Sequence, residues 1–120
     1  METTNIYYYQ NLSISYNRVG MENDRPLLIL HGWGSTKQVM MPLAKQLAKY
    51  RDCYVFDLPG FGNSSVPERP WNVDDYADFI QQFVTDQEFE QVDLLVHSFG
   101  GRIALKLCAR TKAKELIGKV

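Results

Sequence analysis

Residues 96–101, Val96-His97-Ser98-Phe99-Gly100-Gly101, are the stretch that decides the fold. They follow a short apolar run typical of a buried strand, Val92–Val96, and precede an amphipathic stretch that predicts a helix starting near Ser98. A serine on a sharp turn from strand to helix is lifted out of the sheet. The residues two before and two after it must be small, because the two backbones nearly touch there. Gly100 meets this requirement, whereas Val96 does not.

The same turn has two further consequences. It leaves the backbone N–H of Phe99 at the positive start of a helix, where it can stabilise an oxyanion. The methyl groups of Val96 are expected to crowd the start of that helix, and overpacking typically costs about 1–3 kcal/mol. We therefore expect Val96→Gly to raise the stability of the chain or the reactivity of Ser98.

The other apolar runs predict the rest of a sheet. Three short, mostly apolar segments have the pattern of parallel strands buried on both faces: Leu27–Leu30, Cys53–Phe56 and Val92–Val96. Two β-rich segments nearer the N-terminus, Ile6–Tyr9 and Leu12–Tyr16, predict a half-exposed antiparallel pair at a sheet edge, with a turn at Gln10-Asn11.

Helical periodicity separates these strands. Pro42 suits the first turn of one helix, whose predicted apolar stripe comprises Leu43, Ala44, Leu47, Ala48 and Tyr50. Asn72 is a candidate N-cap of a second helix, with the apolar face Val73, Tyr76, Ala77, Ile80, Phe83 and Val84. The alternation of strands and helices predicts an α/β fold with a mostly parallel sheet, antiparallel N-terminal edge strands and helices on both faces.

Two more motifs accompany the serine turn. His31-Gly32-Trp33-Gly34 follows the first buried strand, and Asp57-Leu58-Pro59-Gly60-Phe61-Gly62-Asn63-Ser64 follows the second. With these three motifs in this order, the chain resembles the α/β-hydrolase superfamily over nearly its whole length. The resemblance is to bacterial serine esterases, including carboxylesterases, and to hydrolases of acyl or carbon–carbon bonds. A serine where dehalogenases and epoxide hydrolases carry aspartate disfavours those two branches.

The resemblance implies roles for particular residues. Ser98 matches the nucleophile, and the backbone N–H groups of Trp33 and Phe99 match the oxyanion hole, which places both residues against the substrate. His31 and His97 have structural positions in this family, the first under the oxyanion loop and the second beside the nucleophile with its ring turned away. Asp57 is expected to cap the turn around Pro59-Gly60. Met40 and Met41 either line an acyl pocket or pack in the core.

A nucleophilic serine needs a general base and a third group that orients it. In this fold the chain order is serine, then aspartate or glutamate, then histidine. After Ser98 the sequence contains Glu115 and no histidine. We therefore expect residues 1–120 to form one truncated domain, the N-terminal portion of a serine hydrolase of small ester or acyl substrates, inactive by itself.

The alternative is a non-catalytic remnant or interaction module. Ile117–Val120 resembles the approach to a sixth strand, and without that strand one edge of Val92–Val96 would be unpaired and apolar. Such an edge is a template for another chain. We expect the isolated chain to self-associate through this edge or to be only marginally stable.

Composition excludes several other classes. Thirteen Lys and Arg against fourteen Asp and Glu give a net charge of −1, so we expect no nucleic-acid or membrane partner. The N-terminus lacks a basic signal-like start, which favours a cytoplasmic protein. No nucleotide-binding glycine loop is present, and neither Cys53, Cys108 nor the two histidines suggest a metal site. We expect no cofactor. Residues 51–97 carry ten acidic and two basic side chains and residues 98–120 one acidic and six basic, which predicts adjacent helix faces.

Overall fold

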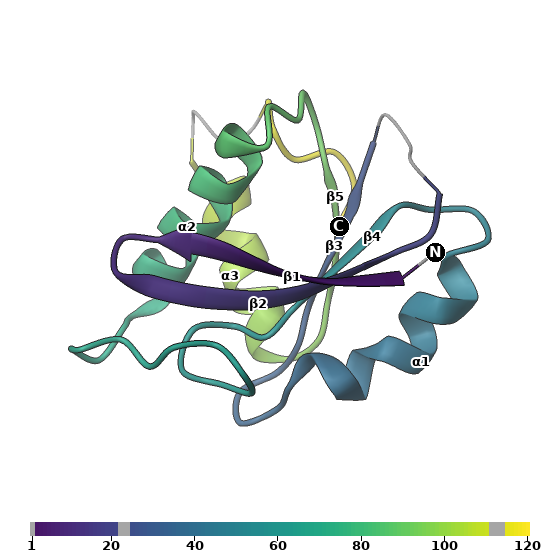
Figure 1. Cartoon of the computed structure of the whole chain (residues 1–120). Helices are drawn as coiled ribbons and strands as arrows, with labels where there is room; N and C mark the ends of the chain where they lie inside the picture. The colour runs from purple at the N-terminus through teal and green to yellow at the C-terminus, as the bar shows by residue number, and fades with distance from the viewer. Residues whose placement is uncertain (1, 22–24, 111–114) are drawn as a thin grey trace.

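The computed structural model describes residues 2–21, 25–110 and 115–120. In these residues the chain forms a five-stranded mixed sheet of order β1-β2-β4-β3-β5 (Figure 1). The strands are β1 (Glu2–Tyr9), β2 (Leu12–Val19), β3 (Leu27–Leu30), β4 (Cys53–Phe56) and β5 (Asp93–Val96). The helices are α1 (Lys37–Leu47), α2 (Val73–Asp86) and α3 (Phe99–Cys108). The fold is therefore an α/β fold with a parallel core, as the sequence predicts.

The strand pairing confirms the predicted division of the sheet. β3 pairs in parallel with both β4 and β5, whereas β1 pairs antiparallel with β2, and β2 antiparallel with β4. Gln10 makes the turn between β1 and β2 with a positive φ of 53°. The spatial order differs from the chain order, because β3 lies between β4 and β5. The three strands that precede the predicted motifs therefore lie next to one another, with β3 in the middle.

Side chains that alternate along the strands build a core on each face of the sheet. Leu28, Leu30 and Phe56 face α2 and α3, while Leu27 and Ile29 face α1. Figure 1 shows α1 on one side of the sheet and the α2–α3 pair on the other. Helices on both faces are thus confirmed.

The first helix begins earlier than the sequence predicts. It starts at Lys37, so Pro42 lies inside the helix and not in its first turn. The carboxylate of Asp57 accepts the backbone N–H of Lys37 at 2.8 Å, and this bond satisfies a free donor at the helix start.

The earlier start also changes the face that α1 buries. Met40, Met41 and Ala44 pack against the sheet, whereas Leu43 and Tyr50 are exposed. The predicted stripe is therefore wrong at Leu43 and Tyr50, and the two methionines belong to the core.

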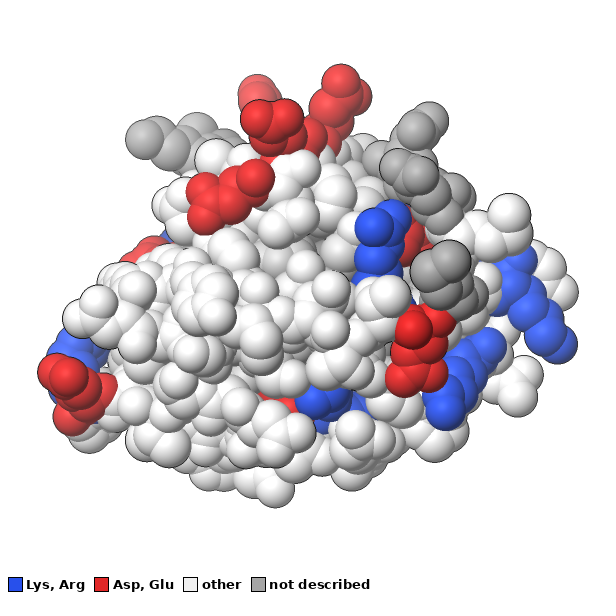
Figure 2. Space-filling view, in the orientation of Figure 1, with Lys and Arg blue, Asp and Glu red and all other residues white. Residues whose placement is uncertain are grey.

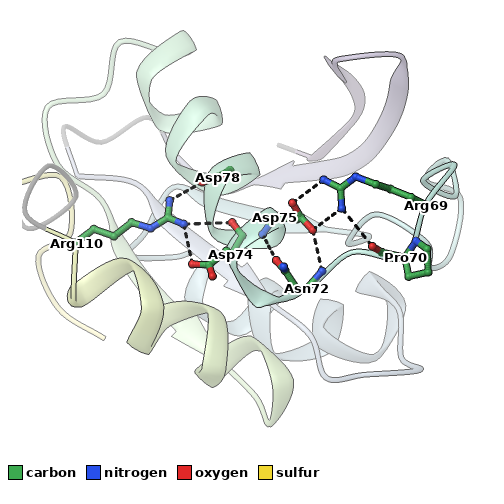
Figure 3. Close-up of polar contacts among 7 residues, drawn as sticks. All are labelled: Arg69, Pro70, Asn72, Asp74, Asp75, Asp78 and Arg110. Atoms are coloured by element: carbon green, nitrogen blue, oxygen red, sulfur yellow. Dashed lines mark hydrogen bonds and ion pairs between the residues drawn. The ribbon is translucent and has the colours of Figure 1, made fainter.

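The second helix begins as predicted. The Asn72 side chain accepts the backbone N–H of Asp75 at 2.9 Å, and the Asp75 carboxylate accepts the backbone N–H of Asn72 at 2.8 Å. This reciprocal pair is a capping box. Arg69 binds the same carboxylate with two hydrogen bonds of 2.8 and 3.0 Å, and so fixes the loop that precedes α2 (Figure 3).

The predicted meeting of acidic and basic helix faces is found between α2 and α3. Arg110 donates to Asp78 at 2.8 Å and to Asp74 at 3.3 Å (Figure 3). Lys106 lies 3.7 Å from the other carboxylate oxygen of Asp74. These pairs align the two helices, although exposed ion pairs typically contribute less than about 1 kcal/mol each.

The outer edge of β5 is less open than the sequence suggests. Ile117 forms a parallel bridge with Val92, and the backbone N–H of Leu94 donates to the C=O of Lys119 at 2.8 Å. The segment after the bridge therefore covers the first half of that edge. The expectation that the whole edge is unpaired is wrong for this half, because residues 116–119 already follow the path of a neighbouring strand.

Asp93 fixes this corner of the molecule. Its carboxylate accepts hydrogen bonds from Arg25 at 2.9 Å, from Arg51 at 2.8 Å and from the backbone N–H of Lys119 at 2.7 Å. Burial raises the pKa of Asp93, but the Lys119 N–H and the two arginines together bring that pKa below its usual value.

The molecular surface agrees with the balanced composition. Figure 2 shows a face over β1 and β2 that is mostly uncharged, with acidic and basic side chains around its periphery. Among the described residues, none of the helices combines the length and the apolar character that crossing a bilayer requires.

Candidate active site

Ser98 occupies the turn between β5 and α3 in a conformation that side chains rarely adopt. Its φ is 53° and its ψ is −111°, so the backbone reverses sharply between Val96, which ends the strand, and Phe99, which begins the helix. The Ser98 side chain is exposed and does not cap the helix. A positive φ at a non-glycine residue typically costs about 1–3 kcal/mol, which the surrounding structure must offset. The turn therefore presents a free hydroxyl at the end of the parallel core.

Two glycines make this turn possible. A Cβ on Gly100 would lie 2.6 Å from the carbonyl oxygen of Leu30, so only glycine lets α3 cross β3 this closely. A Cβ on Gly32 would lie 3.3 Å from Cβ of Ser98 and 3.1 Å from Nδ1 of His97. The His31–Gly34 loop and the serine turn are consequently in direct contact.

Val96 does not prevent the turn from forming. A Cβ placed on Gly101 would lie 3.7 Å from Cγ2 of Val96, an ordinary van der Waals distance, and Gly101 itself has no side chain there. The crowding expected from the sequence is therefore absent at this position, where even a methyl group would fit beside the valine.

The backbone N–H groups of Trp33 and Phe99 are available beside Ser98. Among the described residues, neither group donates a hydrogen bond to another backbone or side-chain acceptor. The N–H of Phe99 lies at the start of α3, where the helix dipole adds partial positive charge. The two rings touch, with centroids 5.1 Å apart, so the two residues lie side by side. Such donors can bind an anionic oxygen next to the serine.

His31 is engaged within the fold. Its ring is fully buried, and its Nε2 accepts the backbone N–H of Leu58 at 3.0 Å. The proton therefore resides on Nδ1, which donates to the C=O of Gly32 at 2.7 Å. Burial lowers the pKa of His31, although the Gly32 carbonyl and the charge of Asp57 oppose this effect. His31 thus joins the β3 loop to the β4 loop as a neutral ring.

Asp57 anchors the loop after β4. It is buried and accepts hydrogen bonds from the backbone N–H of Asn63 at 3.0 Å and from the Lys37 Nζ at 2.8 Å. The same ammonium donates to the Ser15 hydroxyl at 2.9 Å. Asp57 therefore has the structural role expected from the sequence, extended to the start of α1. Lys37 is 2% exposed, and the sequence analysis missed it because a lysine at a helix start is ordinarily solvated.

Two cavities flank the indole of Trp33. One, of about 500 Å³, is lined by Trp33, Ser98, Phe99 and Arg102. The other, of about 420 Å³, has mainly apolar walls: Trp33, Gly60, Phe61, Val66, Pro67, Glu68, Arg69, Pro70, Trp71 and Tyr76. Trp33 contacts the Phe61 ring at 4.9 Å between centroids. The sequence analysis missed Arg102, whose only signal was its position one turn after Ser98.

A general base for Ser98 is not found among the described residues. His31 is fully buried and its ring nitrogens are engaged with Leu58 and Gly32. The His97 Nδ1 lies beside Gly32, and in the described ranges it forms no hydrogen bond with the Ser98 hydroxyl. The described ranges also contain no group of three or more His, Cys, Asp or Glu side chains that could hold a metal ion. The residues that the sequence predicts for the nucleophile and the oxyanion hole therefore come together, without a base.

Comparison with protein families gives a match over most of the chain. A family model described as the alpha/beta hydrolase fold matches residues 25–120. These residues include the His31–Gly34 loop, the Asp57–Ser64 loop and the serine turn.

Curated relatives include proteins named as an esterase and as a hydrolase. The pimeloyl-(acyl-carrier protein) methyl ester esterase of Aeromonas salmonicida is 36% identical over 110 residues, covering 88% of this chain and 39% of that protein. The 2-hydroxymuconate semialdehyde hydrolase of a Pseudomonas species is 37% identical over 92 residues, covering 71% of this chain and 31% of that protein. The chain thus spans less than two fifths of the length of these relatives.

Solved structures show the same arrangement. The crystal structure of a membrane phospholipase A, described as a bacterial virulence factor, superposes with a TM-score of 0.86 at 28% identity. The superposition covers 98% of this chain and 39% of the phospholipase chain.

Proposed function

The chain belongs to the alpha/beta hydrolase fold family, and we propose that it supplies the nucleophile and the oxyanion hole of a serine hydrolase that acts on small ester or acyl substrates. The observation that carries the proposal is the serine turn. Ser98 has a φ of 53°, an exposed side chain and no capping role, so its hydroxyl is held out of the sheet at an energetic cost.

The proposed reaction is acyl transfer. The Ser98 Oγ attacks the carbonyl carbon of the substrate, and its proton passes to a general base. The carbonyl oxygen becomes an oxyanion, which the backbone N–H groups of Trp33 and Phe99 bind. Preorganised donors of this kind typically contribute about 3–4 kcal/mol each to the transition state.

When the oxyanion collapses, the bond to the leaving alcohol breaks and the base gives its proton to that alcohol. Water then attacks the acyl-Ser98 ester with its proton passing to the same base, and the acid product is released as the proton returns to the Ser98 Oγ. The steps need no metal or cofactor.

The substrate class rests on the relatives and on the cavities. The names of the relatives describe a methyl ester esterase and a semialdehyde hydrolase. The cavity that contains Ser98 shares Trp33 with a second, mainly apolar cavity of about 420 Å³, which the Phe61 ring and the loop from Val66 to Trp71 also line. A cavity of this size suits a small apolar acyl group.

The base and its orienting acid come, in this proposal, from outside these 120 residues. A serine without its base loses most of the catalysis of a triad. We therefore expect slow acyl transfer by this chain alone, and rescue by a small base in solution.

The test is release of p-nitrophenolate from p-nitrophenyl butyrate with increasing imidazole. The rate with the unchanged chain should rise above that with Ser98→Ala, and the difference should grow with imidazole. Ser65→Ala is the matched control, because the Ser65 hydroxyl is already used to accept the backbone N–H of Ser13 at 2.8 Å. Equal rates for the unchanged chain and Ser98→Ala at every imidazole concentration would overturn the proposal.

One observation favours the second candidate, an interaction module. Beyond the part of β5 covered by residues 116–119, the Val96 N–H and the Leu94 C=O have no backbone partner in the described ranges, and Val120 is exposed. A second copy could pair there. Sedimentation velocity over a range of concentrations tests this candidate: a rising sedimentation coefficient supports it, and a single monomer boundary contradicts it.

A further inference from the structure

Two basic residues of α3, Arg102 and Lys106, are followed by Arg110 two residues after the helix ends. The three are spaced by four residues, which places them above one another along the helix and its C-terminal end. The two that are farther from Ser98 face α2 and pair with acids: Lys106 lies 3.7 Å from Asp74, and Arg110 donates to Asp78 at 2.8 Å (Figure 3). Ordinary helix packing thus accounts for the charges of Lys106 and Arg110.

Arg102 has no comparable explanation. Within residues 2–21, 25–110 and 115–120, its side chain forms no hydrogen bond or ion pair. It lies in the first turn of α3, where the helix dipole disfavours a cation, and Lys106 four residues later adds like-charge repulsion. Both effects oppose an arginine at this position. An acidic or neutral residue at position 102 would make α3 more stable.

The position of Arg102 relates it to the nucleophile. Arg102 and Ser98 line the same cavity of about 500 Å³, together with Trp33 and Phe99. The guanidinium adds a full positive charge to a site that already contains the positive end of a helix. Its planar fork is suited to binding a carboxylate or phosphate through two hydrogen bonds.

We infer that Arg102 binds an anionic group of the substrate, a carboxylate or a phosphate, while Ser98 faces the scissile carbonyl. This inference rests on the proposed hydrolase function and narrows its substrate class. The apolar cavity on the other side of Trp33 takes the apolar part of the substrate, so the preferred substrate is an ester that carries a negative charge on one side of the reacting bond.

Binding tests the inference without requiring turnover. Trp33 and Trp71 are the two tryptophans of the chain and both line the apolar cavity, so the intrinsic fluorescence of the unchanged chain reports on ligands that enter it. The ligands are monomethyl adipate and its neutral counterpart dimethyl adipate, with hexyl phosphate and hexanol as the phosphate pair. We expect each preferred anion to bind about tenfold more tightly than its neutral counterpart, and this preference to shrink at high salt.

Variants test whether the preference for anionic over neutral ligands comes from the Arg102 side chain. Arg102→Gln should remove it while leaving the affinity for the neutral ligands within about twofold. Lys106→Gln is the matched control and should retain the preference, because Lys106 is engaged with Asp74. Retention of the preference by Ser98→Ala is expected as well, since binding does not use the hydroxyl. A thermal melt of each variant confirms that it is folded.

Several results would overturn the inference. They are equal affinities for charged and neutral ligands, no saturable binding of either anion at millimolar concentration, or the same loss in Lys106→Gln as in Arg102→Gln. Preference for the carboxylate or for the phosphate identifies which anion the substrate carries. A reactive Ser98 without anion preference would refute only this inference, whereas anion preference with an unreactive Ser98 would refute only the proposed hydrolase function.

Discussion

Replacing Ser98 by glycine should stabilise the protein. At a φ of 53° and a ψ of −111°, a residue with a Cβ is strained by about 1–3 kcal/mol, and glycine relieves that strain. Glycine also gives the unfolded chain more freedom, which typically costs about 0.4–1 kcal/mol relative to alanine. The strain exceeds the entropy cost, so we expect Ser98→Gly to be more stable than Ser98→Ala by about 1 kcal/mol.

Comparing Ser98→Gly with Ser98→Ala separates the effect of backbone strain on stability from the effect of losing the hydroxyl. The exposed Ser98 hydroxyl has no capping bond, so Ser98→Ala should remain within about 0.5 kcal/mol of the unchanged chain. Urea unfolding followed by circular dichroism measures both differences. Ser35, whose φ is not positive, provides the control. At this position Ser35→Ala should be more stable than Ser35→Gly. If Ser98→Gly is no more stable than Ser98→Ala, the turn is not strained and the reasoning fails.

Three further perturbations test the framework around the site. Lys37→Met should lower the free energy of unfolding by about 3–5 kcal/mol in urea titrations, because it leaves the Asp57 carboxylate buried without its cation; a loss below 1 kcal/mol would contradict this. Gly100→Ala should destabilise by about 1–3 kcal/mol, since its Cβ would meet the β3 carbonyl at 2.6 Å, whereas Gly101→Ala should be neutral or stabilising; equal effects on the melting temperature would refute the difference. Burial raises the pKa of Asp93, but its hydrogen-bond donors lower this pKa by a larger amount, to below its unfolded value of about 3.9. Its contribution to stability is therefore complete above that value and lost as the pH falls through the folded pKa. The stability difference between the unchanged chain and Asp93→Asn should be constant above about pH 5 and shrink below pH 4, and a difference independent of pH would contradict this.

Much of the fold follows from local patterns. The apolar runs of β3, β4 and β5 and the Asn72 cap are properties of short segments, so the sequence predicts them correctly. The start of α1 is different, because it depends on Asp57, twenty residues away, which binds the first N–H of the helix. Periodicity alone places that start at Pro42.

In the candidate site, too, some residues follow from local motifs and others depend on long-range contacts. Ser98, Trp33 and Phe99 lie in motifs with defined spacing, and the structure brings all three together around one cavity. The buried ammonium of Lys37 depends on long-range contacts that no local pattern encodes. In the part of the chain that the structure describes, Arg102 forms no ion pair, and this becomes evident only by contrast with Lys106 and Arg110, whose partners belong to another helix.

The most direct test of the central claim is to map the site of covalent labelling by a fluorophosphonate. The folded chain is treated with the probe, digested and analysed by mass spectrometry, with urea-unfolded chain and Ser98→Ala as controls. We expect one modified residue, Ser98, in the folded chain, faster labelling with added imidazole, and no such label in either control. Labelling spread over several serines, or an unlabelled Ser98 in the folded chain, would contradict it.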